Sequence, residues 1–313
     1  MKHFFNWPTI EYHHMAVQNL ASYTTILAEI ALALHPILLK QIPTNLTTQL
    51  LARLGTYSVG SYAFASPQQV QNTLTSWSGA KSSMAYGLMN LVHIASSYES
   101  YKHLPAGTAL SLFYLYPFFN IIGASLFLKE SFDTSKLPLF LLAFVGVLLI
   151  SKYTKDDDTK TNTEKEDFAN KQSQQPKKHT TYGIFMCLIS ALTETMIFLL
   201  TKSNNESSPW GTMLQLYPGA LLALGAYTLY NKTPISTNSS VWTPLLLFNI
   251  FIGFIGYSLR FFSIPLLPTT IFSLLTFIGV AAGYIWGLLY AQEVPSYGAL
   301  AGAGLITGSL LFL

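Results

Sequence analysis

Four charged residues lie inside long apolar stretches of this sequence, where a charge is unfavourable and its presence needs an explanation. Glu29 stands in TILAEIALALHPILLK and Glu194 in SALTETMIFLLTK, while Arg53 stands in LARLGTYSVGSY and Arg260 in GYSLRFF. A charge at the centre of a membrane-spanning helix costs roughly 2.5–3.5 kcal/mol on insertion scales, so such residues are usually functional. We therefore take these four as the first candidates for a substrate-binding site.

The two glutamates offer proton chemistry. Burial favours the neutral form of a carboxyl group, so Glu29 or Glu194 could exchange a proton for a bound solute. Each lies near the middle of an apolar segment that ends in a lysine, at Lys40 and Lys202. The alternative is structural: either glutamate is simply neutral, or it is paired with a basic group such as Arg53 or Arg260.

The two arginines offer a different chemistry, the recognition of anions. A guanidinium group is planar, and its forked donors match carboxylate and phosphate groups. Arg53 or Arg260 would therefore suit an anionic metabolite. The alternative is that each side chain reaches the membrane surface or neutralises a glutamate, and for Arg260 we favour this second interpretation.

Two tyrosines stand beside prolines within apolar stretches, as Tyr116-Pro117 and Tyr217-Pro218. A proline inside a helix removes a backbone donor and frees a carbonyl group, which a membrane tolerates only against neighbouring helices or a wet cavity. Tyr116 and Tyr217 are therefore candidates for lining such a cavity. The alternative is a kink that serves helix packing alone.

The composition places these residues in an integral membrane protein. Half of the 313 residues are hydrophobic and only 10% are charged, against roughly 25% charged in a typical soluble domain. The net charge of +3 is small, and seven of the 17 basic residues crowd into one segment, so we expect no nucleic-acid partner. A single cysteine, Cys187, excludes an intramolecular disulfide and a cysteine-rich metal site.

Ten segments are apolar and long enough to cross a bilayer as helices, so we predict an all-α membrane protein. A spanning helix needs about 20 mostly apolar residues, because lipid offers the backbone no hydrogen-bond partner. The predicted spans are residues 16–39, 46–66, 82–103, 106–128, 136–152, 182–202, 209–230, 242–264, 267–290 and 295–313.

Residues 152–181 divide these spans into two sets of five. This stretch has no apolar period and contains seven lysines and six acidic residues, which is typical of a flexible polar linker. We therefore expect one five-helix unit at residues 1–151 and a second at 182–313. In the last span, the pairs Gly298/Gly302 and Gly304/Gly308 have a spacing that favours close helix packing, and we expect them to pack against Gly146.

The two units carry matching residues at one separation. Leu104-Pro105 and Leu267-Pro268 lie 163 residues apart, and Glu130 and Glu293 have the same separation. These matches indicate an internal duplication. A duplicated unit with an odd number of spans enters the membrane in the opposite orientation, which predicts two inverted five-helix repeats around a cavity, as in secondary transporters.

The stretch YKHLPAGTALSLFYLYPFFNIIGASLFLKES, followed by LLAFVGVLLIS, resembles the second part of an EamA-type repeat of the drug/metabolite transporter superfamily. Residues 257–313 look like the second copy, although Gly279-Val280 stands where the first copy has Tyr116-Pro117. The resemblance implies a ten-helix solute transporter with both termini in the cytosol. It implies no particular substrate.

A second resemblance concerns the glutamates. The stretches ILAE at Glu29 and E-x7-K at Glu194 resemble the first helix of small multidrug resistance proteins, whose embedded glutamate binds proton and cationic substrate in competition. The spacing differs between the two halves, since Lys202 follows Glu194 by eight residues and Lys40 follows Glu29 by eleven. The two glutamates are therefore not strict repeat equivalents.

These observations predict a secondary transporter of a small polar or amphipathic organic metabolite, coupled to protons through Glu29 or Glu194. Two alternatives remain: an exchanger of anionic metabolites held by Arg53 or Arg260, and a non-transporting scaffold or receptor on the same fold. We expect no enzyme, cofactor or metal site, because no ligand cluster, nucleophile–base pair or glycine loop is present. The expected setting is a monomer or homodimer in the cell (inner) membrane.

Overall fold

The computed structural model describes residues 7–42, 44–104, 106–131, 133–146, 148–149, 152–153, 180–204, 208–292 and 296–312. Every regular element within these ranges is a helix. Most of the predicted linker, including residues 154–179, and the predicted repeat residue Glu293 lie outside the described residues.

The first half of the chain forms the helices that carry Glu29, Arg53 and Tyr116. These elements are α1 (Trp7–Leu32), α2 (His35–Gln41), α3 (Leu46–Phe64), α4 (Pro67–Val70), η1 (Gln71–Thr75), α5 (Trp77–His103), α6 (Ala106–Phe113), α7 (Tyr116–Gly123), η2 (Ala124–Leu128) and η3 (Thr134–Lys136). The last of these opens an apolar helical segment, Thr134–Gly146.

The second half forms the helices that carry Glu194, Tyr217 and Arg260. These elements are α9 (Thr180–Ser203), α10 (Pro209–Leu216), α11 (Pro218–Tyr230), α12 (Ser239–Phe248), η4 (Asn249–Phe254), α13 (Ile255–Ser263), α14 (Thr269–Thr276), α15 (Ile278–Ala291) and α16 (Tyr297–Leu311).

The predicted spans coincide with helices, although their bounds differ. Helical residues occur in all ten predicted segments, while α1 begins nine residues earlier than predicted, at Trp7. The stretch IEYHH is polar, and a search for apolar spans cannot detect a helix that continues beyond the apolar region. Among the described residues, four helices are long and apolar enough to cross a membrane: Met15–Leu39, Thr181–Ser203, Ser239–Ser263 and Thr269–Tyr290.

Prolines divide several of the predicted spans into two helices. Pro36, Pro117 and Pro218 each lie in the first turn of a helix, in α2, α7 and α11. Proline suits this position because its missing N–H group has no intrahelical partner there. The break between α14 and α15 falls at Phe277 without a proline, so tertiary packing must hold it.

Two loop conformations recur at the separation that relates the two halves. Lys129 ends η2 in the left-handed conformation, with φ 56°, and Gln292 ends α15 in the same way, with φ 54°. The two residues lie 163 positions apart. Positive φ is uncommon for residues other than glycine, and among the described residues Lys232 is the one other that has it.

Many polar side chains are buried beside the hydrophobic core, and many large apolar side chains are exposed. The buried polar and charged residues include Glu29, Arg53, Glu194 and Arg260. The exposed large apolar side chains include Val59, Leu126, Phe127, Leu222, Leu229, Phe251, Ile285 and Leu289. This distribution suits a protein whose outer surface faces lipid and whose interior must satisfy its own polar groups.

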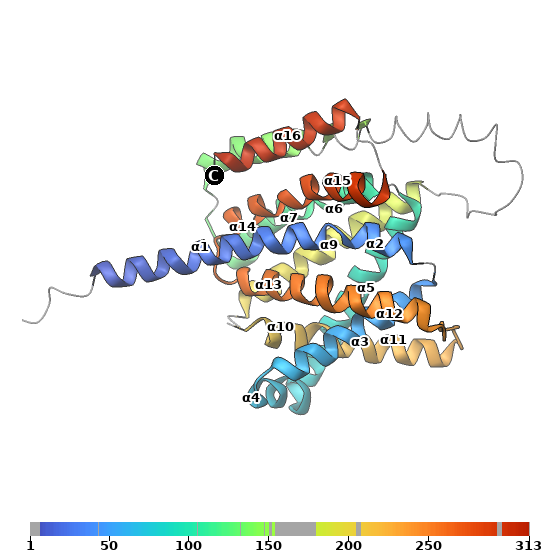
Figure 1. The fold of residues 1–313 in the computed structure, drawn as a ribbon. Helices are drawn as coiled ribbons and strands as arrows, with labels where there is room; N and C mark the ends of the chain where they lie inside the picture. Colours follow the sequence, from blue (N-terminus) through green and yellow to red (C-terminus); the bar gives the residue numbers. More distant parts are fainter. Residues whose placement is uncertain are drawn as a thin grey trace, which may run out of the picture.

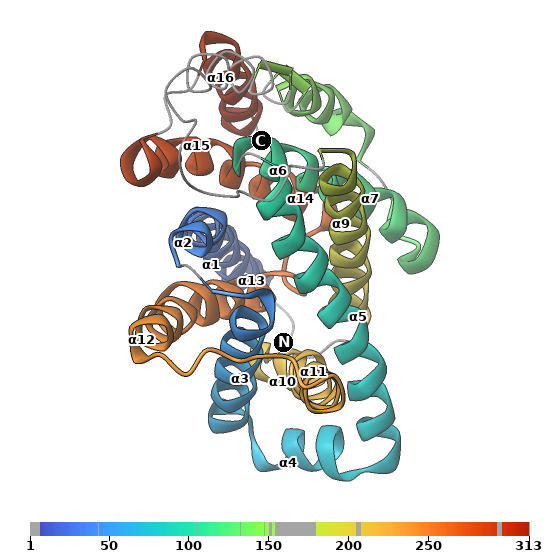
Figure 2. The same cartoon turned by 90° about the vertical axis from the view of Figure 1, so that its right-hand side faces the viewer.

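The two halves interlock in a reciprocal way, which Figures 1 and 2 show from two sides. Helix α1 of the first half packs against α13 of the second, and α9 of the second half packs against α5 of the first. Likewise, α1 contacts α14 and α15, while α9 contacts α6 and α7. Helix α3 completes the interface by packing against α10 and α11. The site described below lies among these contacts.

Glycines allow the closest of the helix contacts. A Cβ atom at Gly146 would lie 2.6 Å from the carbonyl oxygen of Gly302, so the segment Thr134–Gly146 packs against α16 as predicted (Figure 2). The expectation was wrong for Gly304 and Gly308, which have no atom within 4 Å of such a position. They lie on a different face of α16 from Gly302.

Candidate functional site

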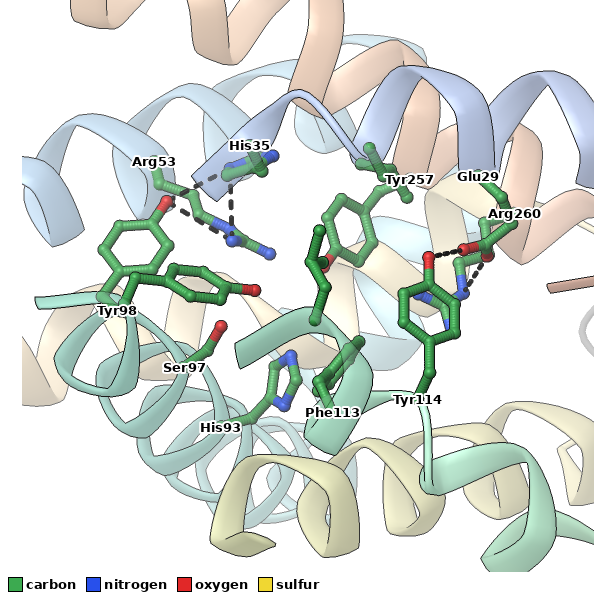
Figure 3. A pocket seen from close by; sticks show the side chains of 13 residues that line it. Glu29, His35, Arg53, His93, Ser97, Tyr98, Phe113, Tyr114, Tyr257 and Arg260 are labelled. Atoms are coloured by element: carbon green, nitrogen blue, oxygen red, sulfur yellow. Dashed lines mark hydrogen bonds and ion pairs between the residues drawn. The ribbon is translucent and has the colours of Figure 1, made fainter. Parts of the chain in front are cut away.

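A small cavity lies between the two halves, at the crossing of α1, α3, α5, α6 and α13. Its volume is about 30 Å³, enough for water but far below the roughly 300 Å³ or more of a typical ligand pocket. Figure 3 shows the side chains that line it. They are Glu29, Leu32, His35, Arg53, His93, Ser97, Tyr98, Tyr101, Leu110, Phe113, Tyr114, Tyr257 and Arg260.

At one end of this cavity, two glutamates share one arginine; we call Glu29, Glu194 and Arg260 the acidic triad. Arg260 Nη2 lies 2.7 Å from Glu194 Oε1, and Arg260 Nε lies 3.4 Å from Glu29 Oε1. All three residues are at most 3% exposed. Neither arginine nitrogen has a hydrogen bond of normal geometry, so charge attraction is the main interaction. With both carboxylates ionised, the triad carries one uncompensated negative charge.

Neighbouring side chains hold the two carboxylates in place. The Tyr114 hydroxyl donates a hydrogen bond to Glu29 Oε2 over 2.8 Å. His93 Nε2 lies 3.1 Å from Glu194 Oε2. The ring of Tyr116 lies on the other side of the arginine, with its centroid 5.0 Å from Arg260 Cζ. Arg260 is therefore held by two charges and an aromatic face.

The other nitrogen of His93 indicates where its proton lies. His93 Nδ1 is 3.1 Å from the carbonyl oxygen of Ser190. A carbonyl oxygen only accepts, so this contact favours the tautomer with hydrogen on Nδ1. Nε2 then faces the Glu194 carboxylate, and one of these two groups must carry a proton for a hydrogen bond to form between them.

Gly279 makes room for the contact between Tyr114 and Glu29. A Cβ atom at this position would overlap the Tyr114 hydroxyl and would lie 3.2 Å from Glu29 Oε2. Gly279 stands 163 residues after Tyr116. Tyr116 thus places its ring against Arg260, and Gly279 makes room for the Tyr114 hydroxyl beside Glu29.

At the other end of the cavity, Arg53 lies among aromatic rings; we call Arg53, Tyr57, Tyr98 and Tyr257 the arginine cage. Arg53 Cζ lies 5.4, 5.6 and 4.7 Å from the ring centroids of these three tyrosines in turn. Arg53 Nη1 also lies 3.4 Å from Tyr98 Oη and from His35 Nε2. Tyr257 and Arg260 are one turn apart on α13, so this helix connects the two ends of the cavity.

The six residues proposed from the sequence fall into these two groups. Glu29, Glu194, Arg260 and Tyr116 come together at the acidic triad. Arg53 and Tyr217 lie near each other in the second group, where Tyr217 packs edge-on against Tyr57 at 4.8 Å between ring centroids. Tyr116 and Tyr217 are fully buried and are not among the residues that line the cavity. Their contact with a solute remains a prediction.

Sequence reasoning did not assign a role to several residues of the site. His93, Tyr98, Tyr114, Tyr257 and Gly279 are not among the site residues proposed from the sequence. Only Tyr257 gave a usable signal, because its spacing of three from Arg260 places both on one helix face. The others are brought in by contacts between residues far apart in the sequence.

The described part of the chain contains no cluster of three or more histidine, cysteine or acidic side chains suited to a metal ion. What the site does contain is a set of proton-binding groups and one arginine without an acidic neighbour. This arrangement can hold protons and water.

Comparison with known proteins agrees with this picture. Residues 19–152 match the model of the EamA-like transporter family, which confirms the resemblance inferred from the sequence. No curated protein matches the chain. Among solved structures, 27 chains match; one, described only as "Crystal structure of protein", is 13% identical with a TM-score of 0.64, covering 94% of this chain and 95% of that one. At this identity the similarity shows a shared fold alone.

The family match and the apolar helices together indicate a membrane transporter, integral to the lipid bilayer and acting on a small-molecule solute. They point to transport rather than to catalysis.

Proposed function

We propose that this chain is a secondary transporter that moves a small polar or amphipathic organic metabolite in exchange for protons, by alternating access between two inverted five-helix halves. The halves comprise residues 1–151 and 182–313. The single observation that carries the proposal is the acidic triad, in which the first long helix of each half contributes one carboxylate to the same arginine.

The reciprocal packing of the helices supports the repeat arrangement. If the two halves are equivalent, the contact of α1 with α13 corresponds to the contact of α9 with α5, and both contacts are extensive. The matching left-handed residues Lys129 and Gln292 occupy equivalent positions in this scheme. Figure 1 also shows the start of α1 and the end of α16 on the same side of the bundle, as an even number of spans requires.

The position of the triad suits a coupling role. Glu29 belongs to α1 and Glu194 to α9, and each helix packs mainly against the opposite half. A rocking motion of one half against the other would therefore change the distance of each carboxylate from Arg260. The uncompensated negative charge must be neutralised by a proton or by a cationic group of the solute, which makes the two compete.

His93 supplies a second place for the coupling proton. It lies on α5 and reaches Glu194 on α9, which is the most extensive contact between the two halves. A proton shared between the imidazole and the carboxylate holds these helices together. Loss of that proton would leave two buried acceptors facing each other, which is unfavourable and would weaken the contact.

The small size of the cavity fits an occluded conformation. A volume of about 30 Å³ has room for water and none for an organic metabolite. In an alternating-access cycle, the site must widen toward one side of the membrane to admit a solute. The buried polar groups of the cavity would then contact the solute instead of one another.

Uptake into proteoliposomes tests the proposal. Purified protein should transport a metabolite found in a panel of amino acids, organic acids, amines, sugar phosphates and nucleotides, and an imposed pH gradient should change the rate. Failure to transport any compound, in vesicles where the protein is folded, would favour the scaffold or receptor alternative.

Exchange of anionic metabolites is the second candidate function, and Arg53 is the observation that favours it. Arg260 does not support it, because two carboxylates already neutralise this residue. Exchange without protons would show transport that needs a counter-substrate inside the vesicle and does not respond to a pH gradient.

A further inference from the structure

Arg53 is a buried cation without an acidic partner. It is 2% exposed, and none of the ion pairs among the described residues includes it, whereas Arg260 forms two. Burying an unpaired charge is strongly unfavourable. An ionisable residue buried in this way is by default a candidate binding site, where a ligand of opposite charge compensates it.

The unused donors of Arg53 form a defined geometry. Nη1 contacts Tyr98 and His35, while Nε and Nη2 have no hydrogen-bond partner. Nε and Nη2 point in parallel from one edge of the guanidinium plane, and together they form the fork that binds the two oxygens of a carboxylate. The edge that remains is therefore the one best suited to a planar anion.

The groups that surround Arg53 are aromatic, and the buried Tyr217 also lies close to it. Tyr57, Tyr98 and Tyr257 lie within 6 Å of the guanidinium carbon and stabilise the cation through their faces. They supply no negative charge near neutral pH. Figure 3 shows the guanidinium group between Tyr98 and Tyr257, in the wall of the cavity.

We propose that Arg53 binds a carboxylate group of the transported metabolite through its Nε and Nη2 atoms, so that the substrate is a carboxylic acid or amino acid. This inference rests on the proposed transport function for the identity of the ligand as substrate. The carboxylate would lie in the arginine cage, and the rest of the solute would extend toward the acidic triad. An amino acid would match both ends, because its ammonium group suits the excess negative charge of the triad.

Thermal unfolding of the full-length protein in detergent tests the carboxylate site with simple probes. Sodium acetate and sodium phosphate are compared with sodium chloride at one pH and one ionic strength. Acetate should raise the unfolding temperature in a saturable way, by about 2–4 °C at a concentration far above its dissociation constant. Phosphate should raise it less, because a tetrahedral anion fits less well between the tyrosine rings.

Arg53→Gln is the decisive variant. It should abolish the acetate response, and its unfolding temperature in chloride should equal or exceed that of the wild type, because an unpaired buried charge has been removed. Arg53→Lys should keep less than half of the response, since an ammonium group lacks the fork. Lys81→Gln, which removes an exposed cation beside Trp77, should retain the full response and serves as the matched control.

Three outcomes would overturn the inference: an acetate response that survives in Arg53→Gln, no acetate response in the wild type, or a phosphate response as large as that of acetate. The test is independent of transport. The protein could show an acetate response that depends on Arg53 and yet transport no compound. That result would support the anion site and contradict the proposed transport function.

Discussion

The hydroxyl of Tyr114 donates a hydrogen bond to Glu29 across 2.8 Å, in a space that exists because residue 279 is a glycine. The tyrosine comes from the first half of the chain and the glycine from the second. Residues from both halves of the chain therefore position the carboxylate that we propose as a coupling group.

Gly279→Ala should displace Tyr114 from Glu29. The added methyl group would overlap the tyrosine hydroxyl and ring, and overpacking of this kind costs about 1–3 kcal/mol. We expect a lower unfolding temperature together with at least a tenfold loss of proton-coupled uptake. Thermal unfolding and proteoliposome uptake measure the two effects.

Two controls separate the packing effect from the hydrogen bond. Gly304→Ala adds the same methyl group where no atom lies within 4 Å and should change neither quantity. Tyr114→Phe removes only the hydroxyl and should reproduce the transport defect with a smaller loss of stability. Full activity in Tyr114→Phe would show that this hydrogen bond has no role in coupling.

Glu29→Gln should abolish the dependence of transport on pH while the protein remains folded. Glutamine keeps the size of the side chain and can still accept from Tyr114, but it cannot release a proton. The rate of uptake should then be the same with and without an imposed pH gradient. Glu99→Gln, at a partly exposed ion pair with Lys102, is the matched control and should behave as the wild type.

Arg260→Gln should destabilise the protein strongly. Removing the guanidinium leaves two buried carboxylates facing each other, and breaking a buried ion pair in this way costs about 3–5 kcal/mol. Reversible unfolding in denaturant measures the loss. The double variant Arg260→Gln/Glu29→Gln should recover part of the stability, because only one uncompensated carboxylate, that of Glu194, is then left.

The expected change in stability differs between the Arg260→Gln and Arg53→Gln variants. If both arginines were only structural, their glutamine variants would both lose stability. We expect a loss at Arg260 and none at Arg53. Equal losses of stability at the two positions would show that a group within the protein already stabilises the charge of Arg53.

Gly146→Val should weaken the packing of the segment Thr134–Gly146 against α16. The valine side chain would collide with the backbone of Gly302, and helix backbones can approach this closely only across small residues. We expect the unfolding temperature to fall by several degrees, in line with about 1–3 kcal/mol of overpacking. Gly308→Val, which meets no neighbouring atom, should leave it unchanged.

The sequence was sufficient for the helical fold class and for the choice of charged residues. Glu29, Arg53, Glu194 and Arg260 stand out without any structure, because apolar segments of membrane length rarely contain charges. The match of residues 19–152 to a transporter family agrees with the predicted class of protein. The positions of the helical segments also followed from the sequence, because lipid imposes both length and composition on a spanning segment, although their bounds and internal breaks did not.

Only the tertiary structure decided what these charges do. Glu29 and Arg260 are 231 residues apart, and no local pattern distinguishes an arginine that meets two carboxylates from one that meets none. That difference depends on which faces of α1, α9 and α13 turn toward one another. Periodicity defines the faces of a helix but not its neighbours, so the neutralised Arg260 and the unpaired Arg53 became distinguishable only once the two halves were packed together.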